Sequence, residues 1–144
     1  MKIVILTILF METYVNDNKE IVYYDFSYYK KLNKDGSLVT LTNSDALSQA
    51  VKIWLGCKPN EKIRSNGGGI LYQFLGKIMD DEQANRMREI IISGLKEDFD
   101  PPLTPVLVDV KGDYENERWI ISLVAYNVDL QIGVNTKVII TNVI

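Results

Sequence analysis

The sequence predicts an α+β domain in which amphipathic helices pack on a small, mostly antiparallel β-sheet, with an N-terminal β-hairpin region. Two observations lead to this prediction. Apolar residues recur at helix spacing between residues 44 and 97, and three β-type runs follow later in the chain. We therefore divide the chain into a strand and hairpin region, residues 1–43, and an α+β domain, residues 44–144, which together form one compact unit.

The N-terminal region reads as strands and turns. The apolar run Ile3–Met11 is too short to span a membrane, and its β-branched residues favour a buried first strand. The apolar part of a signal peptide and a later translation start are the alternatives for this run. Ile21–Tyr24 is a second β-type run, and Asp35-Gly36 predicts a two-residue hairpin turn between Tyr28–Leu32 and Leu38–Leu41.

A first helix is predicted over residues 44–55. Ser44 is a good N-cap residue, and Gly56 stands where a left-handed C-terminal cap is placed. Four apolar residues between them share one helix face, namely Leu47, Ala50, Val51 and Trp54. We expect this face, and Trp54 above all, to lie in the core.

Two further helices are predicted after a loop over residues 58–69 that contains three successive glycines. The first is short and covers residues 70–78, with an apolar face made of Leu71, Phe74, Leu75 and Ile78. The second covers residues 81–97, where Asp80 and Gln83 resemble a capping box. Its apolar stripe consists of Ala84, Met87, Ile91 and Leu95.

The remainder of the chain predicts three β-strands, Val106–Val110, Trp119–Tyr126 and Val138–Val143. The segment before them is kept extended by three prolines, Pro101, Pro102 and Pro105. The two turns between the strands are placed at Asn116 and at Gly133 and Asn135. Strands joined by short turns pair antiparallel, so we expect a small sheet with the helices on one face.

The composition narrows the possible chemistry. The chain has no histidine, which removes the commonest general base and zinc ligand, and we expect neither a metal nor a cofactor. Cys57 is the single cysteine, so no internal disulfide is possible. A net charge of -3 without a basic stripe argues against nucleic acid as a partner, and no run is long enough for a membrane span. Gly67-Gly68-Gly69 lacks the ending of a phosphate-binding loop and predicts a flexible turn.

Three short motifs follow one another in the predicted helical part of the chain. They are Pro59, Glu61 and Lys62 after the first helix, residues 66–69 before the short helix, and Asp100-Pro101 before the sheet. In order and spacing they resemble the T-x-P-G-E-R loop, the P-x-F-G segment and the E-P-R tripeptide of a phage baseplate wedge family. This family is often labelled "gene 25-like lysozyme" and includes a baseplate subunit of type VI secretion systems. Lys62 replaces the arginine of the loop motif, and Pro102 replaces the arginine of E-P-R.

The resemblance implies a structural role in a contractile tail and a location in the tail baseplate of a virion. Family members bind the helical core bundle of the baseplate wedge and present their sheet to the first ring of the tail sheath, which starts sheath assembly. The implied partners are the wedge core-bundle proteins and the tail sheath protein, with tube or hub proteins as further candidates. The implied contact residues in the motifs are Pro59, Glu61, Lys62, Asp100 and Pro101. A type VI secretion baseplate subunit is the alternative setting.

The last predicted strand supplies the other part of the implied contact surface. The given sequence ends in an apolar run without a polar tail, Val138, Ile139, Ile140, Thr141, Asn142, Val143 and Ile144. An exposed sheet edge offers unpaired N–H and C=O groups that a partner strand completes. The alternative for this run is an ordinary inner strand of the domain's own sheet.

The family label also raises a second class of function, a tail-associated peptidoglycan hydrolase resembling lysozyme. Glycoside hydrolysis needs two carboxyl groups at a defined separation, one of them with a raised pKa. The 19 acidic residues of the chain include no pair with a distinctive spacing, and Glu61 stands between Asn60 and Lys62 in a polar loop. We therefore expect no catalytic residue, and a structural protein rather than an enzyme.

Overall fold

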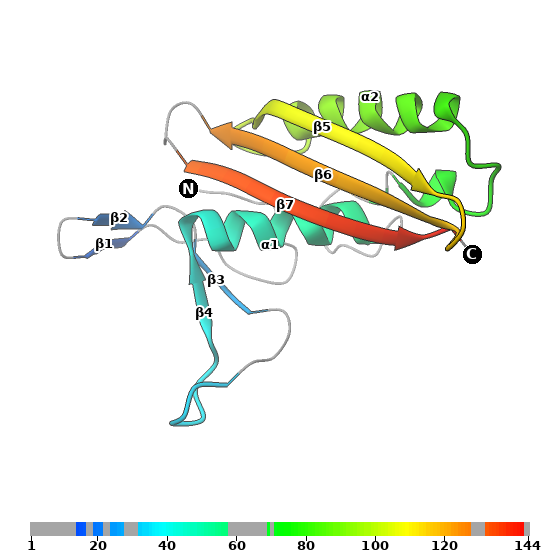
Figure 1. Ribbon diagram of the computed structural model, residues 1–144. Coiled ribbons are helices and arrows are strands. Elements are labelled where there is room, and N and C mark those ends of the chain that lie inside the picture. The colour runs from blue at the N-terminus through cyan, green and yellow to red at the C-terminus, as the bar shows by residue number, and fades with distance from the viewer. Residues whose placement is uncertain are drawn as a thin grey trace.

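A computed structural model gives the arrangement of the chain (Figure 1). The residues that it describes are 14–16, 19–21, 24–27, 32–57, 69, 71–127 and 132–142. Over these residues the chain forms two α-helices, one 3-10 turn and antiparallel strands, so the predicted α+β class is confirmed. The run Ile3–Met11, most of the loop 58–69 and the segment Tyr28–Lys31 lie outside the described residues.

A three-stranded antiparallel sheet forms one layer of the described fold. Its strand order is β5-β6-β7, and the strands span Thr104–Asp113, Arg118–Asn127 and Ile132–Thr141. Alternate residues of β6 are buried, including Trp119, while their neighbours are partly exposed, so one face of the sheet carries the core. The first two strands lie where the sequence predicts them, and Asn116 lies in the turn between them, as predicted.

The third strand begins earlier than the sequence predicts. β7 starts at Ile132 instead of Val138, so the prediction that Gly133 and Asn135 lie in a turn is wrong. Buried and exposed residues alternate along this part of β7, and both turn-forming residues occupy exposed positions. Small and polar residues are tolerated on the outward face of a sheet, so they do not end the strand there.

The first helix, α1, spans Asn43–Gly56. Its predicted apolar face is confirmed, because Leu47 and the other three residues of that face are buried. Both predicted caps are wrong. The N-cap is Thr42 with an extended backbone, so Ser44 lies inside the helix, and Gly56 is the last helical residue. The chain leaves the helix through an extended Cys57, whose N–H still bonds to the carbonyl of Ile53, so no left-handed glycine is needed.

The short helix predicted over residues 70–78 is a single 3-10 turn, η1, at Tyr72–Phe74. Leu71 and Phe74 are buried as predicted, but Ile78 is 81% exposed. Gly76 has a positive φ of 75°, a conformation that stops a right-handed helix. The predicted helical face therefore ends before Ile78.

The second α-helix, α2, spans Asp81–Glu97, as predicted. Its predicted N-cap is confirmed, because the Asp80 side chain accepts a hydrogen bond of 2.8 Å from the Gln83 N–H. All four residues of the predicted apolar stripe are buried. Beyond the helix, the Trp54 indole N–H of α1 donates to Asp98 at 2.8 Å, and the Trp54 and Phe99 rings meet edge to face at 5.3 Å.

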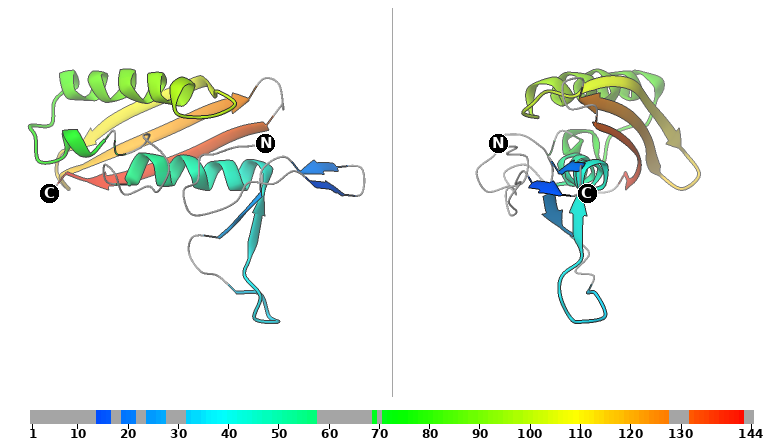
Figure 2. Two further views of the ribbon diagram at one scale, coloured as in Figure 1. Left: turned by 180° about the vertical axis from the view of Figure 1, so that it is seen from behind. Right: turned by 90° about the vertical axis from the view of Figure 1, so that its left-hand side faces the viewer.

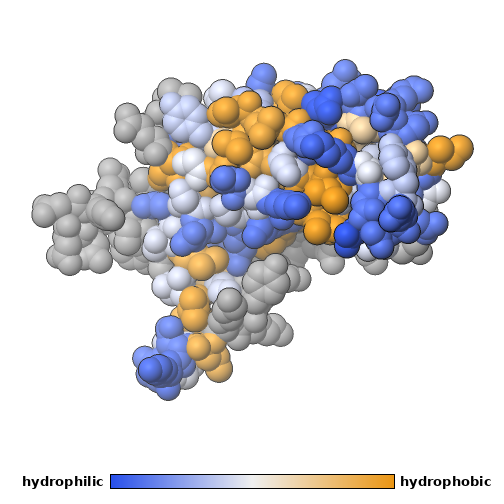
Figure 3. Space-filling model, in the orientation of Figure 1, coloured by the Kyte–Doolittle hydropathy of each residue, from blue (hydrophilic) through white to orange (hydrophobic). Residues whose placement is uncertain are grey.

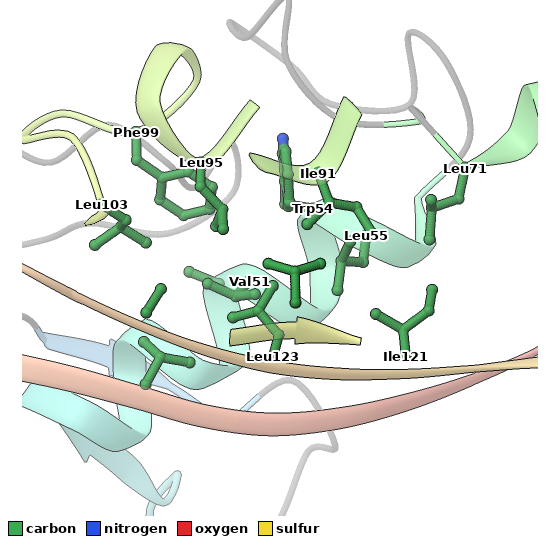
Figure 4. Close-up of a cluster of buried hydrophobic side chains, with 14 of the residues drawn as sticks. Val51, Trp54, Leu55, Leu71, Ile91, Leu95, Phe99, Leu103, Ile121 and Leu123 are labelled. Carbon is green, nitrogen blue, oxygen red and sulfur yellow. The ribbon is translucent and has the colours of Figure 1, made fainter. Parts of the chain in front are cut away.

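The helices cover the inner face of the sheet, as the two views in Figure 2 show. α1 packs beside β7 and α2 packs beside β5, so each helix packs against one edge strand. Side chains from both helices and from β6 meet in the core, and Figure 4 shows among them Val51, Trp54, Leu55, Ile91, Leu95, Ile121 and Leu123. Neither described helix has the length and apolar content of a membrane span.

Two small hairpins precede α1. β1 (Tyr14–Asn16) pairs with β2 (Lys19–Ile21), and β3 (Tyr24–Phe26) pairs with β4 (Thr40–Thr42). The second hairpin turns at Asp35-Gly36, as predicted, and Leu32 and Leu38 face each other across it. The predicted two-residue turn is wrong, because five residues separate Leu32 from Leu38 and the Asn33 N–H bonds to the Ser37 carbonyl. We call the described residues of this hairpin, 24–27 and 32–42, the arm; it projects away from the sheet (Figures 1 and 2).

Candidate functional site

The hydrogen bonding of β7 shows which of its backbone groups face β6 and which face the outer edge. The Asn142 N–H donates to the Glu117 carbonyl at 2.7 Å, so residue 142 faces β6. In an antiparallel pair the bonding direction alternates from one residue to the next. The register of β6 and β7 runs without a shift, so the even-numbered residues of β7 bond to β6. The odd-numbered residues point their N–H and C=O groups to the outer edge, and these are Gly133, Asn135, Lys137, Ile139 and Thr141.

The opposite edge of the sheet has a hydrogen-bonding side chain against it. The same alternation, followed across β6, directs the backbone groups of Val108 in β5 away from the sheet. The Arg88 guanidinium of α2 donates to the Val108 carbonyl at 3.1 Å, in agreement with that direction. Among the described residues, β7 pairs with no strand on its outer side and its odd-numbered residues have no such side-chain partner. We therefore take the outer edge of β7 as the candidate functional site.

Apolar side chains lie on the outward face of the sheet, on both of its edge strands. Ile139 on β7 is 51% exposed, and Leu107 on β5 is 52% exposed. Figure 3 looks onto this face and shows hydrophobic side chains separated by hydrophilic ones. Lys137 lies opposite Ser122 of β6, between the position of Ile139 and the position of Leu107 along the sheet. A strand added to β7 would therefore meet both free backbone groups and an apolar outward side chain.

Five of the predicted site residues lie together at the end of β7 and just beyond it. Ile139 and Thr141 face outward, whereas Val138 and Ile140 are partly buried against the core. Asn142 is held in place by two hydrogen bonds, from its backbone N–H to the Glu117 carbonyl and from its side-chain amide to the Lys77 carbonyl at 3.0 Å. The remaining predicted contacts Pro59, Glu61, Lys62 and Val143 lie outside the described residues, as do Gly67, Gly68 and Ile144.

Asp100 and Pro101 lie far from this part of β7. They belong to the connection between α2 and β5, at the opposite end of the sheet from the end of β7 (Figure 1). Asp100 is exposed and forms no ion pair with another described residue, and Pro101 is partly buried. The structure thus separates the two predicted contact regions. The neighbouring acid Asp98, which the sequence analysis did not single out, holds Trp54.

A buried acid in the arm is a second feature that sequence reasoning missed. Asp25 in β3 is completely buried, and its carboxylate accepts hydrogen bonds from the Phe26 N–H at 2.7 Å and the Gln49 amide at 2.9 Å. Gln49 also donates to the Phe26 carbonyl at 2.8 Å, so α1 holds the base of the arm. Burial raises the pKa of Asp25 to about 6, although both hydrogen bonds act in the opposite direction.

A groove opens at the end of the molecule where β7 ends. It has a volume of about 370 Å³ and is lined by Gly76, Lys77, Met79, Tyr114, Glu117 and Asn142. We call it the end groove. Its wall combines the loop after η1 with the turn between β5 and β6, and the Asn142 side chain links the end of β7 to Lys77. Within the described part of the chain, no cluster of three His, Cys, Asp or Glu residues is arranged to hold a metal ion.

Comparison with known proteins adds no relative. No family model, no curated protein and no solved structure matches this chain.

Proposed function

We propose that this protein is a structural baseplate component of a contractile tail, located in the virion, which connects the wedge core bundle to the tail sheath and starts sheath assembly. The observation that carries the proposal is the outer edge of β7, which no other described strand pairs with and where five residues direct their backbone groups away from β6. An edge of this length provides hydrogen bonds for a partner strand, which is how β-strand addition joins two chains.

Two further features support the proposal. The described elements follow one another as helix, short helical turn, long helix and three-stranded sheet, which agrees with the order that the resemblance to the baseplate wedge family implies. The predicted motif contact at Asp100 and Pro101 lies at the opposite end of the sheet from the end of β7. A connector needs two separate surfaces, one for each partner. We assign the wedge bundle to the surface at Asp100 and Pro101, and the sheath protein to the edge of β7.

Disruption of the gene followed by negative-stain electron microscopy tests the role in assembly. We expect tubes or baseplates without an attached sheath. Complete contractile particles that fail only to penetrate the host wall would instead point to a tail-associated hydrolase. Clearing of purified peptidoglycan by the purified protein is the direct measurement for that alternative.

A substitution at Lys137 tests strand addition itself. Lys137→Pro removes an N–H that points to the free edge and leaves the bonds between β6 and β7 in place. Lys137→Ala is the matched control, because it removes the same side chain and keeps the N–H. We expect the proline variant to lose binding to the sheath protein and the alanine variant to keep it. Equal binding by both folded variants would rule out pairing at this edge.

A further inference from the structure

The outer edge of β7 is long, and no described strand pairs with it. Its outward-directed residues begin at Gly133 and end at Thr141, a stretch of nine residues with Lys137 at its centre. A long unpaired edge is prone to pair with other chains, and proteins protect such an edge with a charge or cover it with another segment. Lys137 supplies the charge, and the sequence contains a segment that suits the cover.

That segment is Ile3–Met11, which lies outside the described residues. It also has nine residues, eight of them apolar, and its β-branched residues favour an extended strand. Its single polar residue, Thr7, is at its centre, as Lys137 is at the centre of the edge. The segment and the edge therefore match in length and in the position of their polar residue.

The topology of the chain sets the direction of such a pair. The hairpin of β1 and β2 lies at the end of the domain where β7 begins (Figures 1 and 2). Met11 precedes Tyr14, the first residue of β1, by three positions, a reach of at most about 11 Å. The end of the segment is thus kept near the start of β7, and a strand that ends where its neighbour starts is antiparallel to it.

We propose that Ile3–Met11 forms a fourth strand of this sheet, antiparallel to β7 of the same chain, with Thr7 opposite Lys137. In this register Met11 lies opposite Gly133, in agreement with the short connection to β1. The odd-numbered residues of β7 face the outer edge, so they exchange backbone hydrogen bonds with the odd-numbered residues of the segment. The edge is then paired over its whole length.

The register suits the side chains on the outward face of the sheet. Ile5 lies opposite Ile139 and covers a side chain that is 51% exposed. Thr7 places a hydroxyl, and not an apolar side chain, beside the Lys137 ammonium. A shift of the register by two residues in either direction would set Ile5 or Leu9 opposite Lys137 instead. The polar pair at the centre therefore favours one register over its neighbours.

The same register places apolar residues on the inward face. Val138 and Ile140 of β7 pack against the core and are only partly buried. Leu6 lies opposite Val138 and Val4 lies opposite Ile140, so each of the two receives an apolar neighbour at the open side of the core. A shift by one residue would turn the Thr7 hydroxyl toward the core, where burial without a hydrogen bond is unfavourable.

The segment keeps the edge of β7 closed until a partner strand replaces it. This consequence rests on the proposed function, in which the sheath protein adds a strand to β7. The incoming strand takes over the backbone hydrogen bonds of Ile3–Met11, so the edge does not pair before the sheath protein is present. The segment is thus an intramolecular competitor for the site that starts sheath assembly.

Amide hydrogen exchange measured by NMR on the purified full chain tests the cover. The even-numbered N–H groups of β7 bond to β6 and serve as the internal reference. We expect the odd-numbered N–H groups from Gly133 to Thr141 to exchange slowly as well, and Thr7→Pro to speed their exchange on the order of tenfold or more. Thr7→Ala keeps the N–H and should leave them slow. Fast exchange of the odd-numbered groups in the wild type, or slow exchange that Thr7→Pro does not change, would overturn the proposal.

A disulfide identifies the covering segment and its register. Residues of a hydrogen-bonded antiparallel pair have Cα atoms about 5.5 Å apart, which a disulfide can join. Thr7→Cys with Lys137→Cys, in a chain that also carries Cys57→Ser, should form a bridge within one chain on mild oxidation. Thr7→Cys with Asn135→Cys is displaced by two residues and is the control that should not bridge. A missing bridge, or a bridge between two chains, contradicts a cover from the same chain.

The two experiments separate this inference from the proposed function. Both use the protein alone, whereas the sheath contact is measured with Lys137→Pro and the sheath protein. A failed cover together with normal sheath binding would remove only the competitor. A confirmed cover with no sheath binding would remove the proposed partner and leave the fourth strand in place.

Discussion

Asp25 makes the stability of this protein depend on pH in an unusual direction. Burial raises its pKa from 3.8 to about 6 in the folded state. The folded state therefore binds this proton more tightly than the unfolded state does. The stabilisation is complete below about pH 4 and is lost as the pH rises through 6. A difference of about two pKa units, at about 1.4 kcal/mol per unit, gives a loss of roughly 3 kcal/mol between pH 4 and pH 7.

Denaturant unfolding of the wild type and of Asp25→Asn at pH 4 and pH 7 measures this loss. We expect the stability of the variant relative to the wild type to rise by roughly 3 kcal/mol over this interval. The pKa values of Asp35 and Asp113 are lowered, by hydrogen bonds from Ser37 and from Asn116 respectively, but they contribute equally to both proteins and cancel in the difference. The stability difference at a single pH is not the readout. In the wild type the Gln49 amide donates to the Asp25 carboxylate, and Asp25→Asn places a second amide opposite it, which changes the stability at every pH.

Parallel stability profiles for the two proteins would refute this reasoning. A direct titration of the Asp25 carboxyl carbon by NMR checks the cause separately. A midpoint near 4 would show that the carboxyl group is less desolvated than its burial indicates.

Two further predictions concern the helices. Gly94→Ala should destabilise the fold by about 1–3 kcal/mol, because a Cβ there would overlap the buried Trp54 ring, while Ser93→Ala on the exposed side of α2 should have little effect in the same denaturant experiment. Asp80→Ala should cost about 1 kcal/mol by removing the acceptor for the Gln83 N–H, and Asp80→Asn should keep most of that stability; a melting temperature unchanged by the alanine would show that this cap is not needed.

The parts of the fold that the sequence predicts well depend on neighbouring residues. α2 combines a capping residue, Asp80, with an apolar stripe at helix spacing, and both signals act within the helix itself. Predictions based on single residues were less accurate. Gly133 and Asn135 are typical turn residues, but they lie in β7 because the residues between and beside them fill the core. Whether such a residue ends a strand thus depends on the packing of its neighbours, which the residue type alone does not indicate.

The candidate sites were harder to predict because they join distant segments. Asp25 is buried by its contact with Gln49, which is 24 positions away in the sequence. The end groove joins the loop near Lys77, the turn near Tyr114 and Asn142, and no local motif connects these three segments. The sequence did indicate an apolar last strand. It could not show which backbone groups are free, because that depends on the register with β6.

A free strand edge must admit its partner without pairing with a second copy of itself. Lys137 lies in the middle of β7 among the residues whose backbone groups face outward. If two β7 edges paired antiparallel about this position, the two Lys137 residues would stand about 5.5 Å apart at their Cα atoms, where like charges are destabilising. A lysine in this place is a known protection against edge-to-edge association. By the same reasoning, a partner strand with an acidic or polar residue opposite Lys137 would pair with this edge more favourably than a second copy of β7 would.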